Sequence, residues 1–483
     1  MYWKPWRLLG AIALCLVVAS TQMATAEPSD IDLQDVLDQY IAENYARSAA
    51  AVLITDDVTQ YAYAGEPGPQ DSSLFQIGSV TKTFNGLLLA QLVSDGRVEL
   101  HTTLGELLGD RLELDDQVET ITLSELATHS SGLPALGSMA FRNALFNPRN
   151  PYVGVDRTDL DRSLSRIDEG DLSERGSFSY SNFGVAVLGN ALAESMGRDY
   201  ESLLRDEVLG DFNLRDTAST PTDPERIVQG HSSNLRATKT WEFDAYAPAG
   251  ALFSTIVDME RLAKIYLAGD DPAVKLTKEV HFEDPKTQVS AGLGTMIDDV
   301  DGQRMIWHNG QTGGYFAWFG VMPESKRAVV LLTDGATLNS VARSILIGEP
   351  EVPGVPKNWL FGLLTIAALF YAPVILAVLR RKLHQSNEEE VGEDKRVGKL
   401  RTIATYMEAG VVLILALKLG TWHWLPMGAL VISSFVTAVM AIWVAAPMRR
   451  AAWLPESTWW RRVMVFGALL FNALVIAFAT LQL

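Results

Sequence analysis

The composition of the chain changes abruptly after Pro356, and this change restricts the possible folds more than any other feature of the sequence. Four long apolar segments follow, at about 359–379, 402–420, 427–446 and 463–482. Each is close to the roughly 20 residues that a helix needs to cross the hydrocarbon layer. Only helices and closed barrels satisfy every backbone polar group there. The sequence therefore predicts a membrane domain at 351–483, an α-helical bundle with about four transmembrane helices.

Basic side chains in the connections between these segments indicate the orientation of the bundle. The second connection, TWHWLPM, has no lysine or arginine, whereas the first and third hold Arg380, Arg381, Lys382, Lys395, Arg396, Lys399, Arg401, Arg449, Arg450, Arg461 and Arg462. Cytoplasmic connections carry the excess of positive charge. The first and third connections are therefore predicted to be cytoplasmic, and the domain that precedes the bundle to lie outside.

The segment 402–420 carries two ionisable residues. Lys418 is near enough to the end of the segment to extend to the interface. Glu408 lies nearer the middle, where ionisable groups are costly and often functional, so its role stays open. If this segment does not span, three helices remain and the C-terminus changes sides.

The first 26 residues have the pattern of a secretory signal peptide. Lys4 and Arg7 precede the apolar run LLGAIALCLVVA, and Ala24-Thr25-Ala26 is a small-residue cleavage site. The run is short for a membrane span, which favours a cleaved signal over a signal anchor. The single cysteine, Cys15, lies in this run, so the mature chain is predicted to have no disulfide and no thiolate nucleophile.

Charge and composition exclude other classes of function. The formal net charge is -18 and no basic patch dominates, which argues against a nucleic-acid partner. The sequence has no His-Glu-x-x-His motif and no paired histidines at ligand spacing. We therefore predict neither a metal site nor a cofactor.

Residues 27–350 have the mixed pattern of an extracytoplasmic α/β domain. Strands are expected at 48–55 and 58–65 near the start, and at 304–309, 315–322 and 328–335 near the end. Asp301-Gly302 supplies a turn ahead of the last three strands. The intervening chain is mainly helical, so one sheet is predicted to take strands from both ends of the domain, with a helical lobe formed by its middle.

The stretch FQIGSVTKTF (75–84) carries the first candidate site. Ser79 and Lys82 stand at positions i and i+3, so on a helix they share a face and can touch. A serine hydroxyl needs a base, and a lysine serves as one if burial or a nearby cation lowers its pKa. Gly78 permits a tight turn before the serine. The Ser79 N–H at a helix start would be free to bind an oxyanion.

The stretch FSYSNFGVAVLG (178–189) carries the second candidate site. Tyr180 supplies a phenol, which near a lysine ammonium would titrate low enough to act as a base or an acid. Asn182 has both a donor and an acceptor with which to orient a substrate amide. A single tyrosine of this kind is otherwise an ordinary half-buried core residue.

The stretch IWHNGQTGGYFAWFG (306–320) carries the third candidate site. His308, Asn309 and Gly310 lie on a predicted strand, where a glycine allows close approach of a substrate backbone. A single histidine in such a place is also often only structural.

These three ordered motifs resemble those of the serine β-lactamase and penicillin-binding-protein-like superfamily. The phrases ITLSELATHSSGLP (121–134) and PAGALFSTIVDM (248–259) are similar to its class C β-lactamase-related branch, and the likeness spans about 31–340. The resemblance implies the β-lactamase/DD-peptidase-like fold, an antiparallel sheet flanked by helices plus a helical lobe. It also implies that Ser130 and Ser131 belong to a structural loop below the site.

The resemblance also implies roles by position. Ser79 would be the acylated nucleophile, and Lys82 and Tyr180 would share proton transfer. The backbone N–H groups of Ser79 and Gln311 would form the oxyanion hole. Asn182 would position the substrate amide, and the set His308, Asn309 and Gly310 would bind substrate at the place of the family's Lys-Thr-Gly triad.

The chain departs from the family pattern at that triad. Histidine is charged only part of the time near neutral pH, so His308 is a weaker anchor for a substrate carboxylate than lysine. Asn309 also lacks the threonine hydroxyl. The departure favours a D-amino-acid peptidase, carboxypeptidase or esterase over a β-lactamase.

The leading hypothesis is a multi-pass cell-membrane serine hydrolase that acts through an acyl-enzyme on a small-molecule or peptide-like amide or ester. Three alternatives stay open: a β-lactamase, a penicillin-binding receptor that senses β-lactams or peptidoglycan without turnover, and an inactive scaffold. Membrane-anchored peptidases that remove an acyl-D-amino-acid group from natural-product precursors share the architecture, but with three helices rather than four.

Overall fold

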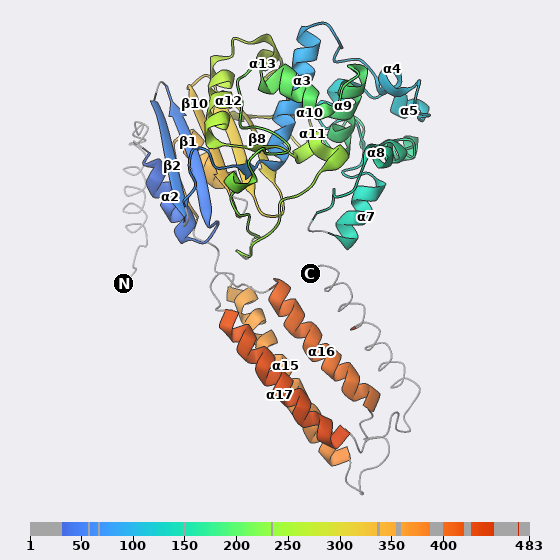
Figure 1. Ribbon diagram of the computed structural model, residues 1–483, viewed down its shortest axis with the longest axis vertical. Helices are drawn as coiled ribbons and strands as arrows, with labels where there is room; N and C mark the ends of the chain where they lie inside the picture. Colours follow the sequence, from blue (N-terminus) through green and yellow to red (C-terminus); the bar gives the residue numbers. More distant parts are fainter. Residues whose placement is uncertain are drawn as a thin grey trace, which may run out of the picture.

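The computed structural model (Figure 1) describes residues 31–353, apart from 57, 66–67, 148–149, 233–234 and 336–338, and then residues 359–386, 399–419, 427–448 and 472. The predicted signal peptide and the fourth apolar segment, except residue 472, lie outside the described residues.

An antiparallel sheet forms the centre of residues 31–353. Its eight strands have the order β2-β1-β10-β9-β8-β7-β6-β5. Their bounds are β1 (Ser48–Thr55), β2 (Val58–Gly65), β5 (Phe282–Asp284), β6 (Val289–Ala291), β7 (Met296–Val300), β8 (Gln303–Gln311), β9 (Phe316–Met322) and β10 (Arg327–Thr333). Because β1 pairs with β10, the sheet is built from both ends of the domain, as the sequence predicted.

The sequence located most of this sheet correctly. Strands β1 and β2 have the predicted bounds, and β8, β9 and β10 are close to theirs. The turn at Asp301-Gly302 is confirmed, with both residues at positive φ between β7 and β8. Strands β5, β6 and β7 were missed because all three are short. In addition, β5 and β7 carry acidic residues, which are depleted in strands.

Two apolar cores lie on opposite faces of the sheet. Val52, Val330 and Phe319 belong to the larger core, which the sheet shares with the helical lobe. Leu53 and Trp318 belong to the smaller one, under α2 and α14. Both cores arise from the period of two in each strand, since the central strands are buried on both faces.

The helical lobe occupies the middle of the chain, as predicted, and carries the helix that begins beside Ser79. The helices of the domain are α2 (Leu33–Ala42), α3 (Thr81–Ser94), α4 (Leu104–Leu108), α5 (Asp116–Glu119), α6 (Leu123–Ala127), α7 (Ser138–Phe146), α8 (Arg157–Leu164), α9 (Asn182–Ser195), α10 (Tyr200–Leu204), α11 (Ala247–Gly250), α12 (Ile256–Ala268), α13 (Pro272–Thr277) and α14 (Asn339–Ile347). A π-helical turn, Arg205–Leu209, follows α10, and 3-10 turns lie at Gly78–Val80, Glu169–Leu172, Pro224–Arg226 and Asp244–Tyr246. Two short strands, β3 (Phe75–Gln76) and β4 (Phe253–Ser254), pair separately.

Three helices follow the domain: α15 (Trp359–Ser386), α16 (Lys399–Leu419) and α17 (Met427–Met448). Ala372 and Leu376 of α15 pack with Ala409 of α16 and Val444 of α17. Figure 1 shows the three helices together below the domain. By length and composition, the described residues contain one helix able to cross a membrane, Leu363–Gln385, and a shorter apolar helix at Ala429–Ala445.

Glu408, whose role the sequence left open, is paired in the structure. The Tyr371 hydroxyl of α15 donates to its carboxylate on α16. This polar contact gives the carboxylate a hydrogen-bond partner and joins the two helices.

Candidate active site

The chain presents Ser79 at the junction between a strand and a helix. Strand β3 ends at Gln76, and the 3-10 turn Gly78–Val80 leads directly into α3. Gly78 has φ +52°, and a Cβ there would lie 2.7 Å from the Gln311 nitrogen. Only glycine meets both conditions, so the tight turn expected at this position is present. It leaves the Ser79 side chain partly exposed.

Lys82 lies one helical turn after Ser79 and is fully buried. Its Nζ is 3.0 Å from Ser79 Oγ, 2.7 Å from Asn182 Oδ1 and 2.7 Å from the Ala249 carbonyl oxygen. No carboxylate pairs with it among the residues that the structure describes. Burial therefore lowers the pKa of Lys82 well below its ordinary value.

Helix α9 brings the second motif to the first. The Ser181 hydroxyl caps the helix by accepting from the Gly184 N–H at 2.8 Å, which fixes Asn182 at the first helical position. The Asn182 amide then bridges two groups, because its Nδ2 donates to the Tyr152 hydroxyl at 3.0 Å and its oxygen faces Lys82.

Tyr180 lies over the lysine, with Lys82 Nζ 4.9 Å from the centre of its ring. Its phenol is hydrogen-bonded to Ser79, yet burial raises the pKa of Tyr180 above its ordinary value. The expectation that this phenol would titrate low was wrong. It assumed a neighbouring ammonium, whereas burial lowers the pKa of Lys82. The geometry therefore pairs a lysine that loses its proton readily with a tyrosine that keeps one.

Strand β8 passes close to the Ser79 turn. A Cβ on Gly310 would lie 1.9 Å from the Ile77 carbonyl oxygen and 2.8 Å from the Ser79 nitrogen, so only glycine fits. Thr312 N–H donates to Tyr315 across the hairpin at 3.0 Å. The alternation of an antiparallel ladder then turns the Gln311 N–H away from β9, toward the Ser79 turn. The Ser79 and Gln311 N–H groups are thereby placed at one edge of the site.

His308 lies behind Tyr180 rather than at the surface. It is 2% exposed, and its ring centre is 6.3 Å from that of Tyr180. Burial, with a contribution from Lys82, lowers the pKa of His308 to about 3, so the ring is neutral at physiological pH. Nδ1 donates to the Asn309 carbonyl at 2.6 Å, and Nε2 has no hydrogen-bond partner among the described residues. A neutral, buried ring offers no positive charge to a substrate carboxylate, so His308 is a weaker anchor than even the partly charged histidine expected from the sequence.

Asn309 is turned away from Ser79. The period of two along β8 puts its side chain on the face of Trp307, which packs in the smaller core under α2 and α14. His308 and Gly310 lie on the opposite face, toward the helical lobe. The alternation along β8 therefore does not favour a contact of the Asn309 side chain with substrate, and its role in binding stays a prediction.

The ATHSSGLPAL loop supports the site from below, as the sequence resemblance implied. Ser130 and Ser131 are 3% and 1% exposed, which excludes them as competing nucleophiles. The His129 ring packs 4.3 Å from that of Tyr180, and its Nδ1 accepts from the Ser181 N–H at 3.2 Å. This loop therefore holds Tyr180 and Ser181 of the second motif in place.

Ser79 opens into a cleft of about 460 Å³ whose lining is uncharged. The residues that line it are Gly78, Ser79, Tyr152, Asn182, Ser232, Trp241, Phe243, Ala249, Gly250, Gln311, Thr312 and Gly313. One wall is aromatic, with the Tyr152 ring stacked on Phe243 at 4.9 Å and edge-on to Trp241 at 5.7 Å. Sequence analysis missed this wall, for which the only signal was the aromatic cluster WEFDAY.

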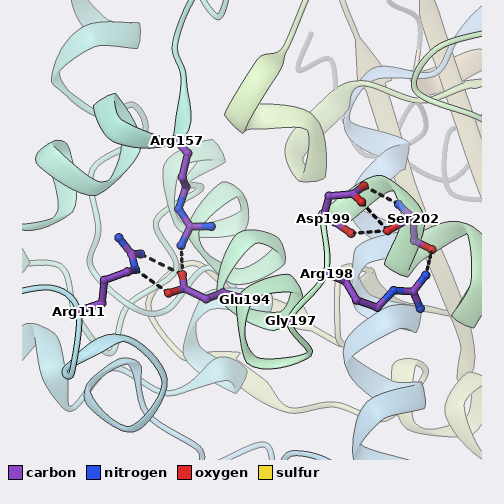
Figure 2. Close-up of a pocket in the computed structure, with 7 residues that line it drawn as sticks. All are labelled: Arg111, Arg157, Glu194, Gly197, Arg198, Asp199 and Ser202. Atoms are coloured by element: carbon purple, nitrogen blue, oxygen red, sulfur yellow. Dashed lines mark hydrogen bonds and ion pairs between the residues drawn. The ribbon is translucent and has the colours of Figure 1, made fainter.

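A larger hollow of about 690 Å³ lies elsewhere in the helical lobe. Figure 2 shows Arg111 and Arg157 both directed at Glu194, and Asp199 bonded to Ser202 at the start of α10. Its charged side chains already have partners, since Arg198 pairs with Asp206 and Glu207 outside the hollow. The hollow contains none of the motif residues. The candidate site is therefore the Ser79 cleft.

The fold and the cleft define a serine hydrolase with the β-lactamase/DD-peptidase fold. The sequence model of the beta-lactamase family matches residues 33–347, and the chain belongs to that family.

Relatives and solved structures agree with this assignment. Penicillin-binding protein 4 of Amycolatopsis lactamdurans is 26% identical over 59% of this chain and 81% of its own length. A D-alanyl-D-alanine carboxypeptidase/endopeptidase of Escherichia coli is 24% identical, over 66% and 88%. A D-stereospecific amidohydrolase from Streptomyces superposes with a TM-score of 0.54 at 21% identity, over 62% of this chain and 93% of that one.

Proposed function

We propose that this protein is a membrane-anchored, extracytoplasmic serine hydrolase that cleaves an uncharged peptide-like amide or ester through an acyl-enzyme on Ser79. The contact of a buried Lys82 amine with the Ser79 hydroxyl carries this proposal. A neutral amine has two N–H donors and one lone pair. The Asn182 and Ala249 oxygens take the two donors, which leaves the lone pair for the hydroxyl proton.

Acylation follows from these positions. Ser79 Oγ attacks the substrate carbonyl carbon as its proton passes to Lys82 Nζ. The oxyanion is bound by the backbone N–H groups of Ser79 and Gln311. When the C–N or C–O bond breaks, the Tyr180 phenol protonates the leaving group and regains a proton from the Lys82 ammonium. Water then attacks the acyl-enzyme by the reverse route, and the carboxylic acid departs.

The lining of the cleft supports one substrate class within this proposal. A buried neutral His308 and an uncharged lining offer no cation for a carboxylate, within the described residues. We therefore favour an internal amide or an ester over a free C-terminal carboxylate. The aromatic wall of Tyr152, Trp241 and Phe243 suits an apolar or aromatic substrate group. The Streptomyces relative is named as an amidohydrolase, and the Escherichia coli relative as both a carboxypeptidase and an endopeptidase. The amidohydrolase and endopeptidase activities agree with this preference, whereas the carboxypeptidase activity does not.

We assign residues 1–26 to a signal peptide, 27–350 to the hydrolase domain and 351–483 to a membrane domain. Helix α15 supports the anchor, since Leu363–Gln385 is long and apolar enough to span a bilayer. The basic connections support an extracytoplasmic position of the hydrolase domain.

Active-site labelling tests the proposal. The full-length protein in detergent is treated with a fluorophosphonate or an activated apolar ester, and with a fluorescent penicillin. We expect the ester to label the protein and this label to decay with time. We expect little labelling by the penicillin. Neither reagent should label Ser79→Ala. Persistent penicillin labelling would instead favour a receptor, and labelling of Ser79→Ala would refute the nucleophile.

A further inference from the structure

Helix α7 has its apolar side chains on the outside. Phe141, Leu145 and Phe146 are 56%, 50% and 60% exposed, and Arg142 is exposed beside them. At 100° per residue, all four fall within one arc of the helix. Isolated exposed apolar residues are ordinary, but three on one nine-residue helix form a patch that calls for a partner.

The other face of α7 is fixed to the domain. Ala140 is buried and Met139 packs against the larger core. Asn143 Nδ2 donates to the Val153 carbonyl at 3.0 Å, and the Gly137 N–H donates to the Tyr246 hydroxyl at 2.8 Å. The patch is therefore held outward by a firmly packed helix.

The end of the domain that carries α7 also carries the connection to α15. The Tyr45 hydroxyl donates to the Pro353 carbonyl at 2.7 Å, which fixes the last residue of the domain just beyond α2. Figure 1 shows α7 at the lower end of the domain in that view. The end of α2 that precedes Tyr45 lies at the same lower end. Six backbone steps separate Pro353 from Trp359, a reach of about 20 Å when fully extended.

We propose that α7 docks on the outer surface of the membrane, with Phe141, Leu145 and Phe146 inserted among the lipid chains and Arg142 at the phosphate level. This rests on the membrane anchoring proposed above. A short tether keeps this end of the domain near the bilayer, and an amphipathic helix with aromatic residues and a cation suits that interface.

The size of the patch favours lipid over a protein partner. Its three side chains expose on the order of 300 Å². A stable protein interface buries about 800 Å² on each partner. Tyr152 of the cleft follows six residues after α7, so docking would hold this wall of the cleft near the membrane.

Depth-dependent fluorescence tests the proposal on the full-length protein in phospholipid vesicles. A Cys15→Ser background receives one cysteine at a time for an environment-sensitive dye: Leu145→Cys on α7, Leu364→Cys on α15, and Ser94→Cys at the end of α3, which Figure 1 shows at the opposite end of the domain. Spin-labelled lipids then quench any dye within the bilayer.

We expect quenching at 145 and 364 several times greater than at 94. Phe141→Ser with Phe146→Ser should reduce quenching at 145 to the level at 94, whereas Val58→Ser, an equally exposed apolar residue on β2, should not. Quenching at 364 without quenching at 145 would overturn docking while leaving the anchor intact. No quenching at 364 would refute the anchor and the docking that depends on it.

Discussion

At the scale of single residues, the low pKa of Lys82 is the property that the proposed chemistry needs most. Its amine contacts one hydroxyl and two carbonyl-type oxygens, and burial favours the neutral form. We expect the acylation rate to rise with pH through the lowered pKa of Lys82 and then to stay level to about pH 10, because Tyr180 keeps its proton. Stopped-flow measurement of the acylation rate at a series of pH values tests this prediction.

Substitution of the base tests the same assignment. Lys82→Gln removes the base, and we expect a loss of about 100-fold or more in acylation, the usual range for general base catalysis. Tyr180→Phe should slow the reaction but leave the acid limb of the pH profile in place. An acid limb that disappears in Tyr180→Phe would show that the titrating base is not Lys82.

His308 gives a prediction for stability. Its pKa is about 3 in the folded protein and 6.5 in the unfolded chain, so between these values only the unfolded state takes up the proton. The free energy of unfolding should therefore fall as pH falls below 6.5, by about 2 kcal/mol for His308 between pH 6.5 and pH 5. His308→Gln should reduce this fall. Unfolding measured at several pH values would contradict the assignment if both proteins lost stability equally.

At the scale of elements, the contact between the Ser79 turn and β8 aligns the two proposed oxyanion donors. Gly78→Ala places a Cβ 2.7 Å from the Gln311 nitrogen, which must move the turn away from the strand. We expect acylation to fall by about 100-fold, as when an oxyanion donor is lost.

Gly96→Ala is the matched control. Gly96 also has positive φ, at +69°, but no atom lies within 4 Å of its added Cβ. It should cost about 1 kcal/mol of stability and leave the acylation rate unchanged. Equal losses of acylation in the two variants would mean that backbone strain, not the position of β8, sets the rate.

The elements also show how far the sequence could predict this site. Helical spacing predicted the contact of Ser79 with Lys82, because i and i+3 meet on any helix. The period of two on β8 was enough to turn Asn309 away from the site, since Trp307 shares its face. The burial of the His308 side chain could not be predicted from the sequence, because the polarity of a residue does not show whether it is buried. The wall of Tyr152, Trp241 and Phe243 depends on chain segments that meet only in the folded protein.

At the scale of the whole molecule, charge should act against anionic substrates. The chain has a formal charge of -18, and the segments that flank 27–350 are net basic, so the hydrolase domain is more acidic than this total. A field of this sign repels a substrate that ends in a carboxylate, and the uncharged cleft provides nothing to offset the repulsion.

Paired substrates measure this effect. An apolar acyl-dipeptide amide and the same dipeptide with a free carboxylate are compared as kcat/KM at low and high salt. We expect the amide to be preferred at low salt and the preference to narrow as the Debye length shrinks from about 30 Å at 0.01 M to about 3 Å at 1 M. The amide carries no charge and serves as the control, so its kcat/KM should change little with salt. A carboxylate substrate that reacts faster at low salt would show that a cation near the cleft attracts it, and the uncharged-substrate proposal would fail.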